Sequence, residues 1–278
     1  MTWQAVAYKD FQDAIRSRML LVLTALFALF VGLAAFAYSE LSGGDPSGGG
    51  LLWALWGPSA LLVPIIAILV SYRSVAGERE LGSMRFLLAL PHTRRAVVFG
   101  KVLGRTAVVA VAVLAGFAIG GAIIYVSYEL SPFAYLGFVA GTILLGLVYV
   151  SVGVGVSAVT GSVSRAAALV VGLFVFVQYL WSYFWLLVVY VTNGFEVPGF
   201  EEFPAWFDVA AALGPGVAYN ELMVSIANRD PNSDIIFAGQ LDDAAIQLPD
   251  WYPLFVFAGW TVVTLGIGYW RFERADLT

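Results

Sequence analysis

The chain has 278 residues, of which 60% are hydrophobic and 12% charged, and its mean hydropathy is +0.86. Soluble domains carry about 25% charged and about 45–50% apolar residues, so this composition excludes an ordinary soluble protein and indicates an integral membrane protein. The chain contains no cysteine, which excludes disulfides and thiolate chemistry.

Six apolar blocks are each long enough to form the helix of about 20 residues that crosses a hydrocarbon core of about 30 Å. None of them contains Asp, Glu, Lys, Arg or His. The sequence therefore predicts an all-α integral membrane protein, with residues 1–278 in a single transmembrane domain. The predicted spans are Met19–Tyr38, Leu52–Tyr72, Thr106–Ser127, Tyr135–Thr160, Ala167–Thr192 and Pro253–Trp270.

The distribution of basic residues predicts the orientation. If both termini are cytoplasmic, thirteen of the 14 basic residues lie inside and only Arg229 lies outside, as the positive-inside rule requires. Thirteen of the 19 acidic residues then lie outside. Such an acidic surface is tolerable where salt screens it, so we expect a prokaryotic plasma membrane in a high-salt environment, that of a haloarchaeon. An ordinary acidic loop is the alternative.

Residues 3–16 have the pattern of an amphipathic helix. Trp3, Val6, Phe11 and Ile15 share one face, on which Asp10 is an intruder. We expect residues 3–18 to form an interfacial helix with its apolar face in lipid. A simple extension of the first span is the alternative.

Outside the membrane, residues 42–50 are rich in Gly and Ser and predict a flexible loop. The longest polar stretch, residues 193–251, also lies outside. Its aromatic residues and the apolar run Val209–Leu213 predict one or two short helices that rest on the membrane before the last span.

A basic cytoplasmic segment, residues 73–105, lies between the second and third spans. Ser83 can cap a short helix that runs to about Leu90, and Thr93 can cap the next helix. No proline interrupts Arg94–Ser127, and 34 helical residues would be about 51 Å long. The third helix should therefore project into the cytoplasm.

An enzyme is not indicated. His92, the one histidine, has no His or Cys partner for a metal, and Gly100-Lys101 lacks the rest of a phosphate-binding loop. Small residues such as Gly116/Gly120, Gly137/Gly141 and the Gly153-Ser157-Gly161 ridge suit close helix packing, either within one chain or between two copies.

The spans also lack the ionisable groups that an ion-coupled transporter would be expected to carry. Gln178 is their most polar residue at depth, and an amide satisfied by a neighbouring helix is the simplest interpretation. Any free energy for transport would then come from another protein. A transporter without an ATPase, an intramembrane enzyme and a membrane scaffold remain alternatives.

Glu78-Arg79-Glu80 with Gly82, followed by a Leu-rich turn that ends at Leu90-Pro91 and Arg94, resembles the first cytoplasmic loop of ABC-2-type permeases. These proteins are the membrane subunits of ATP-binding-cassette exporters. Leu213-Gly214-Pro215 and the ending Trp270–Leu277 agree with this family. The chain is most similar to the branch that contains the permease of nitrous-oxide-reductase maturation, although Arg79 stands where that branch often has an acidic residue.

The resemblance implies a homodimer with two cytoplasmic ABC ATPase subunits. ATP and Mg would be bound by the ATPase, with no cofactor on this chain, and the substrate would take a path between two copies of this chain. It also implies a coupling helix that docks on the ATPase. The docking residues would be Glu78, Arg79, Glu80, Gly82, Met84, Arg85, Phe86, Leu87, Leu90, Pro91 and Arg94.

Overall fold

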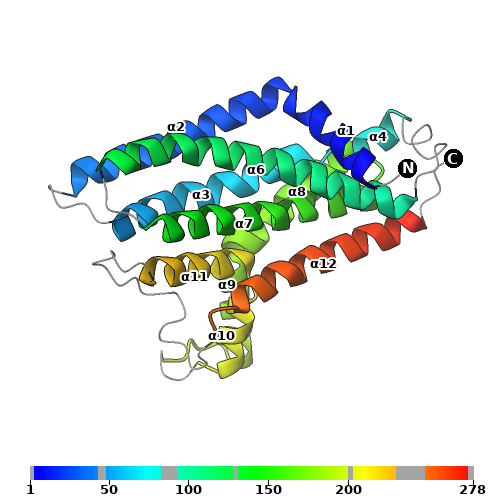
Figure 1. Cartoon of the computed structure of the whole chain (residues 1–278). Coiled ribbons are helices and arrows are strands. Elements are labelled where there is room, and N and C mark those ends of the chain that lie inside the picture. Colours follow the sequence, from blue (N-terminus) through cyan, green and yellow to red (C-terminus); the bar gives the residue numbers. More distant parts are fainter. Residues whose placement is uncertain are drawn as a thin grey trace.

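The computed structural model describes residues 3–42, 48–82, 93–127, 131–199, 203–229 and 248–274, and within these ranges the regular elements are all helices. The long helices run side by side as one bundle (Figure 1). Six candidate spans are long and apolar enough to cross a membrane. They are α2 (Arg18–Leu41), α3 (Gly48–Ser71, continuing to Glu80), α6 (Arg94–Ser127), α7 (Pro132–Val159), the helix run Val163–Thr192 and α12 (Tyr252–Glu273).

These helices confirm the six predicted spans to within a few residues at most ends. α6 has the predicted 34 residues and begins at Arg94, where the Thr93 hydroxyl accepts a hydrogen bond from the Ala96 amide at 3.2 Å. The predicted outer loop, residues 42–50, was too long at its C-terminal end. Residues 48–50 are already helical and belong to α3, which packs against α2.

α7 is the central helix of the bundle. It packs against α3, α6, α11 (Pro215–Asn228) and α12. Its most apolar stretch is 72% buried, whereas the corresponding stretch of α12 is 22% buried. A movement of α7 would therefore change its contacts with most of the other helices in the bundle.

The fifth span is not one regular α-helix. It consists of α8 (Val163–Val175), a π-helical turn at Phe176–Leu180 and α9 (Trp181–Thr192). Such turns are frequently found at functional sites. Here the turn carries Gln178, whose side chain accepts a hydrogen bond from the Tyr149 hydroxyl at 2.6 Å and donates one to the Ala60 carbonyl at 3.3 Å. This half-buried amide thus has the helix partners that were expected.

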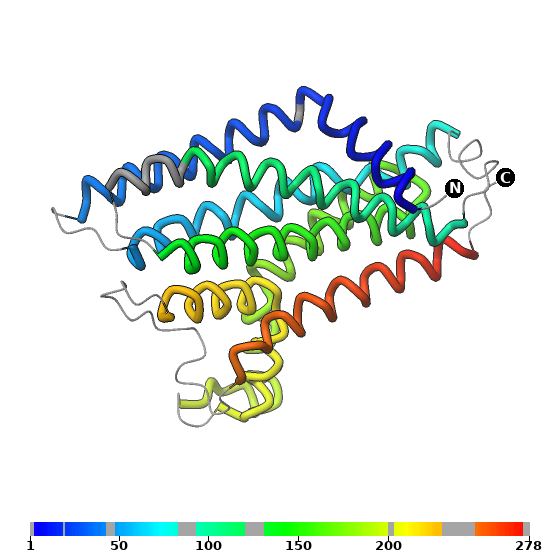
Figure 2. The backbone as a smooth tube through the Cα atoms, viewed as in Figure 1, coloured from blue at the N-terminus to red at the C-terminus, as the bar shows by residue number. Residues whose placement is uncertain are grey.

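Two short helices precede α12: α10 (Ala205–Ala212) and α11, bent by 88° at their junction. Trp181 and Trp260 donate indole hydrogen bonds to the carbonyls of Ala210 and Leu213 at that bend. The prediction that these helices rest on the membrane was wrong for α11, which lies beside α7 and α12 (Figure 2). Tyr219 is fully buried there and its hydroxyl is 2.9 Å from that of Thr142.

The small residues serve packing within the chain. A Cβ atom on Gly116 would lie 2.4 Å from the Phe27 ring of α2, one on Gly141 would meet Met223 of α11 at 2.4 Å, and one on Gly153 would meet Ser71 of α3 at 1.9 Å. Gly161 is different, since a Cβ there would meet nothing within 4 Å. At the first three positions the intramolecular alternative is confirmed.

Candidate functional site

The base of the segment between the second and third spans is held by a serine from the central helix. α4 (Ala76–Glu80) is the short helix that continues α3 beyond the span. The hydroxyl of Ser157 in α7 accepts hydrogen bonds from the backbone amides of Val75 and Ala76, at 3.1 and 2.9 Å. Both amides lie at the start of α4, where a helix has no internal acceptors. A neighbouring span thus supplies the cap that α4 lacks in its own sequence.

Two further side chains bind α4 to the junction between α7 and α8. Arg79 donates to the carbonyls of Ala158 and Thr160, at 3.4 and 3.1 Å, where α7 ends. Glu80 accepts a hydrogen bond from the amide of Val163, at 2.9 Å, where α8 begins. A cation at a helix C-terminus and an anion at a helix N-terminus both complement the helix dipole. Arg79 therefore has a structural role at the junction of α7 and α8.

A cluster of four charged side chains joins α4 to α1 (Trp3–Ile15) and α6. Lys101 of α6 is 2% exposed, and its Nζ lies 2.7 Å from Glu78 Oε1 and 3.5 Å from Asp10 Oδ1. Arg105 binds Asp10 with two nitrogens, Nε at 2.6 Å from Oδ2 and Nη2 at 2.9 Å from Oδ1. Two carboxylates and two cations balance one another, which burial of charge requires.

α1 reaches this cluster because α6 presents two glycines to it. A Cβ on Gly100 would lie 2.8 Å from the Trp3 carbonyl, and one on Gly104 would lie 2.8 Å from the Ala7 carbonyl. The buried stripe of α1 is Val6, Asp10 and Ala14, so its inner face packs on α6. The expectation that the apolar face of this helix lies in lipid was wrong for that stripe.

Asp10 is therefore a functional candidate that sequence reasoning missed. It was judged an imperfection of an amphipathic pattern, yet it is 7% exposed and ion-paired. The signal was present in α6, where Gly100-Lys101 and Gly104-Arg105 repeat at a spacing of four and so place two small residues and two cations on one helix side.

The predicted docking residues divide into two groups. Glu78, Arg79 and Glu80 lie together on α4, and Gly82 follows with a positive φ of 72°. Arg94, by contrast, is bound to α12: it donates to the carbonyls of Phe272 and Glu273 and stacks over the Phe272 ring. Met84, Arg85, Phe86, Leu87, Leu90 and Pro91 lie outside the described residues.

A second candidate site is a cavity of about 650 Å³ on the side of the bundle. It is lined by α3, by the π-helical turn, by α9 and by the α10–α11 bend, and its walls include Trp56, Gln178, Ser182 and Tyr183. Tyr183 is 67% exposed. Polar groups that would face hydrocarbon are costly when they are not satisfied, so this face is poorly suited to bulk lipid.

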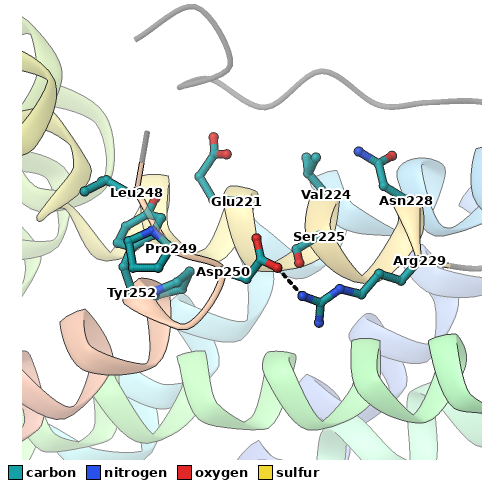
Figure 3. Close-up of a pocket in the computed structure, with 10 residues that line it drawn as sticks. Glu221, Val224, Ser225, Asn228, Arg229, Leu248, Pro249, Asp250 and Tyr252 are labelled. Carbon is teal, nitrogen blue, oxygen red and sulfur yellow. Dashed lines mark hydrogen bonds and ion pairs between the residues drawn. The ribbon is translucent and has the colours of Figure 1, made fainter. Parts of the chain in front are cut away.

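A smaller pocket of about 350 Å³ lies between α11 and the start of α12 (Figure 3). In it Arg229 is paired with Asp250 across the opening, whereas the Glu221 side chain points away from this pair. Both members of the ion pair are exposed, at 61% and 67%, so the pair contributes little stability. No group of three or more metal-binding side chains was found among the described residues.

The arrangement of six spans, with α1 packed on α6 and α4 held by three other helices, can be compared with known families. The model of the ABC-2 family of transporter proteins matches residues 4–277. The chain belongs to this family. The expected family is thereby confirmed over nearly the whole length.

Two relatives of this ABC-2 protein are both named probable ABC transporter permease protein NosY. The one from Pseudomonas aeruginosa is 31% identical over 200 residues, which are 69% of this chain and 73% of the relative. The one from Stutzerimonas stutzeri is 34% identical over 182 residues, which are 62% of this chain and 65% of the relative. These matches and the family support a multi-pass membrane subunit of an ABC transporter.

Proposed function

We propose that this ABC-2 protein is the permease subunit of an exporter, which moves its substrate across the plasma membrane with energy from a separate ATPase subunit. ATP and Mg would be bound by that ATPase, and this chain would supply neither a nucleotide site nor catalysis. The observation that carries the proposal is the attachment of α4 to three helices, through Ser157 of α7, Val163 of α8 and Lys101 of α6.

This attachment suits the transmission of force. α4 leads directly into the segment that resembles a coupling helix, and two of its contacts lie where α7 ends and α8 begins. Because α7 is the most buried span, a displacement of α4 would be passed to the centre of the bundle rather than absorbed at its surface. The region from Glu78 to Pro91 would dock on the ATPase, with Phe86 and Leu87 as apolar anchors.

A second copy of the chain would complete the substrate path. The cavity beside Gln178 and Tyr183 opens on the side of a single bundle, and a partner that covers it would shield its polar walls from lipid. We propose that the two copies face each other across this cavity and expose it alternately to either side of the membrane. Cysteine substitutions at Leu61, which lines the cavity and is 42% exposed, should cross-link two copies, whereas substitutions at Leu29 should not.

The proposed localisation is a prokaryotic plasma membrane with both chain termini in the cytoplasm, in a haloarchaeal cell. The basic residues support the orientation, and the acidic outer side supports the high-salt environment. Figure 1 agrees with a common side for the termini, since α1 and the end of α12 lie at the same end of the bundle.

The docking proposal is tested by pull-down with the soluble ABC ATPase subunit that the proposed function requires. Phe86→Ala together with Leu87→Ala should weaken ATPase binding by tenfold or more, about what the loss of two apolar anchors implies. Phe99→Ala removes a 55% exposed aromatic ring from α6, outside this segment, and serves as the control. Wild-type binding and ATP hydrolysis by the double variant would refute the assignment of the docking segment.

A further inference from the structure

Lys101 is shared unequally between two carboxylates. Its ammonium group is close to Glu78 at 2.7 Å and further from Asp10 at 3.5 Å, and the side chain is 2% exposed. Asp10 does not depend on this lysine, because Arg105 already binds both of its oxygens. Arg105 is itself held in place by a bond to the Val70 carbonyl at 3.0 Å.

The two carboxylates belong to helices that are attached to the bundle in different ways. Asp10 lies on α1, which the close glycine contacts hold against α6, the helix of Lys101. Glu78 lies on α4, at the base of the segment proposed to dock on the ATPase, and it is 29% exposed. If α4 moves, the distance from Lys101 to Glu78 must change more than the distance from Lys101 to Asp10.

We propose that Lys101 is a positioning residue for coupling: it holds Glu78 in the resting state and shifts to Asp10 when the docking segment is displaced. This inference rests on the proposed function. A buried ammonium group without a partner is strongly unfavourable, and a lysine with no second carboxylate would resist the displacement. Asp10 lowers this resistance, since a second acceptor is already within reach of the flexible lysine side chain.

The chemistry of the cluster predicts opposite effects for two variants. Lys101→Met removes the cation that holds Glu78, so α4 should become looser. Asp10→Asn keeps the shape and an oxygen for Arg105, but it leaves two cations near one carboxylate. Glu78 should then be held more firmly, and the displacement of α4 should become harder. A cluster that served only to stabilise the fold would be loosened by both variants.

The distance between α1 and α4 distinguishes these cases. The chain has no cysteine, so cysteines at Tyr8 and Leu81, which are 64% and 80% exposed, can carry a pair of nitroxide labels. Pulsed electron paramagnetic resonance on the reconstituted permease then measures their distance distribution. Relative to wild type, it should broaden in Lys101→Met and narrow in Asp10→Asn. Asp13→Asn, which removes an exposed carboxylate from the same helix as Asp10, should leave the distribution unchanged.

The complex with the ATPase subunit of the proposed function supplies the second readout. A non-hydrolysable ATP analogue should shift the label distance in wild type, and the shift should be reduced in both Lys101→Met and Asp10→Asn. The ATPase rate should fall about tenfold in each, near the lower end of typical coupling between sites, while ATPase binding persists. Asp13→Asn is again the control.

Three results separate the outcomes. Broadening in both variants, or a wild-type ATPase rate in Asp10→Asn, would overturn the role of Asp10 as the second partner. Unchanged distributions in both would show that Lys101 does not position α4. If wild type neither binds the ATPase nor shifts its label distance, the proposed function fails, and the inference that rests on it fails with it.

Discussion

Gly155 of α7 and Gly268 of α12 lie backbone against backbone, since a Cβ atom added to Gly268 would stand 2.7 Å from the Gly155 Cα. A Cβ on Gly155 would stand 2.5 Å from the Thr264 carbonyl oxygen. Neither contact can be relieved by rotating a side chain. The central helix and the last helix are therefore as close as glycine permits, which in membranes is a common source of helix association.

Gly268→Ala should destabilise the protein by about 1–3 kcal/mol, as is typical of overpacking, because α7 and α12 must separate to admit the methyl group. The matched control is Gly266→Ala in the same helix, where a Cβ would meet nothing within 4 Å. The melting temperature in detergent measures both. Gly266→Ala should if anything stabilise α12, because Ala has the higher helix propensity. Equal changes in the two melting temperatures would show that the contact at Gly268 is not the limiting one.

Ser157→Ala should detach the start of α4. Two backbone amides would lose their acceptor, and each unsatisfied buried donor costs about 1–3 kcal/mol. Ser151→Ala is the control, because that hydroxyl donates only within α7, to the Leu147 carbonyl at 2.8 Å. We expect a lower melting temperature and faster proteolysis near Glu80 in Ser157→Ala alone. A stability equal to that of the control would show that the Ser157 hydroxyl does not hold the start of α4.

The orientation can be tested by labelling single cysteines in intact cells with a membrane-impermeant reagent. Leu41 and Val197 are 84% and 64% exposed and lie on the proposed outer side, and Leu81 is 80% exposed on the proposed inner side. Leu41→Cys and Val197→Cys should be labelled from outside and Leu81→Cys only after lysis. Labelling of Leu81→Cys in intact cells would reverse the orientation.

Salt should stabilise the solubilised protein. In the proposed orientation, thirteen acidic residues and one basic residue face outward. The distance over which their repulsion decays, the Debye length, is about 3 Å at 1 M salt and grows to about 10 Å at 0.1 M. The melting temperature and the monodisperse fraction should therefore fall as salt is lowered across this range. Melting temperatures that do not change would leave the high-salt environment without support.

The six spans could be predicted from local sequence, because a helix in lipid must satisfy its backbone hydrogen bonds internally and must be apolar over a fixed length. In α6 the local sequence even predicted the helix bounds. Its start at Arg94 and its 34 residues follow from a capping threonine and the absence of proline. The interruption of the fifth span at Phe176–Leu180 has no such local signal.

The site was predictable only where its residues are neighbours in sequence. Glu78, Arg79 and Glu80 were recognised as a motif, but their partners Lys101, Ala158 and Val163 lie on three other helices. No periodicity within α4 can indicate them.

What the sequence determined by itself was the number of spans and the family, since both depend on composition or on residues close in the chain. Only the tertiary structure revealed the structural role of Asp10. On an isolated helix it interrupts an apolar face, and in the bundle it is the buried partner of Arg105. The physical reason is that a buried charge is tolerated only where another element brings the opposite charge to it, and that element, α6, lies some ninety residues further along the chain.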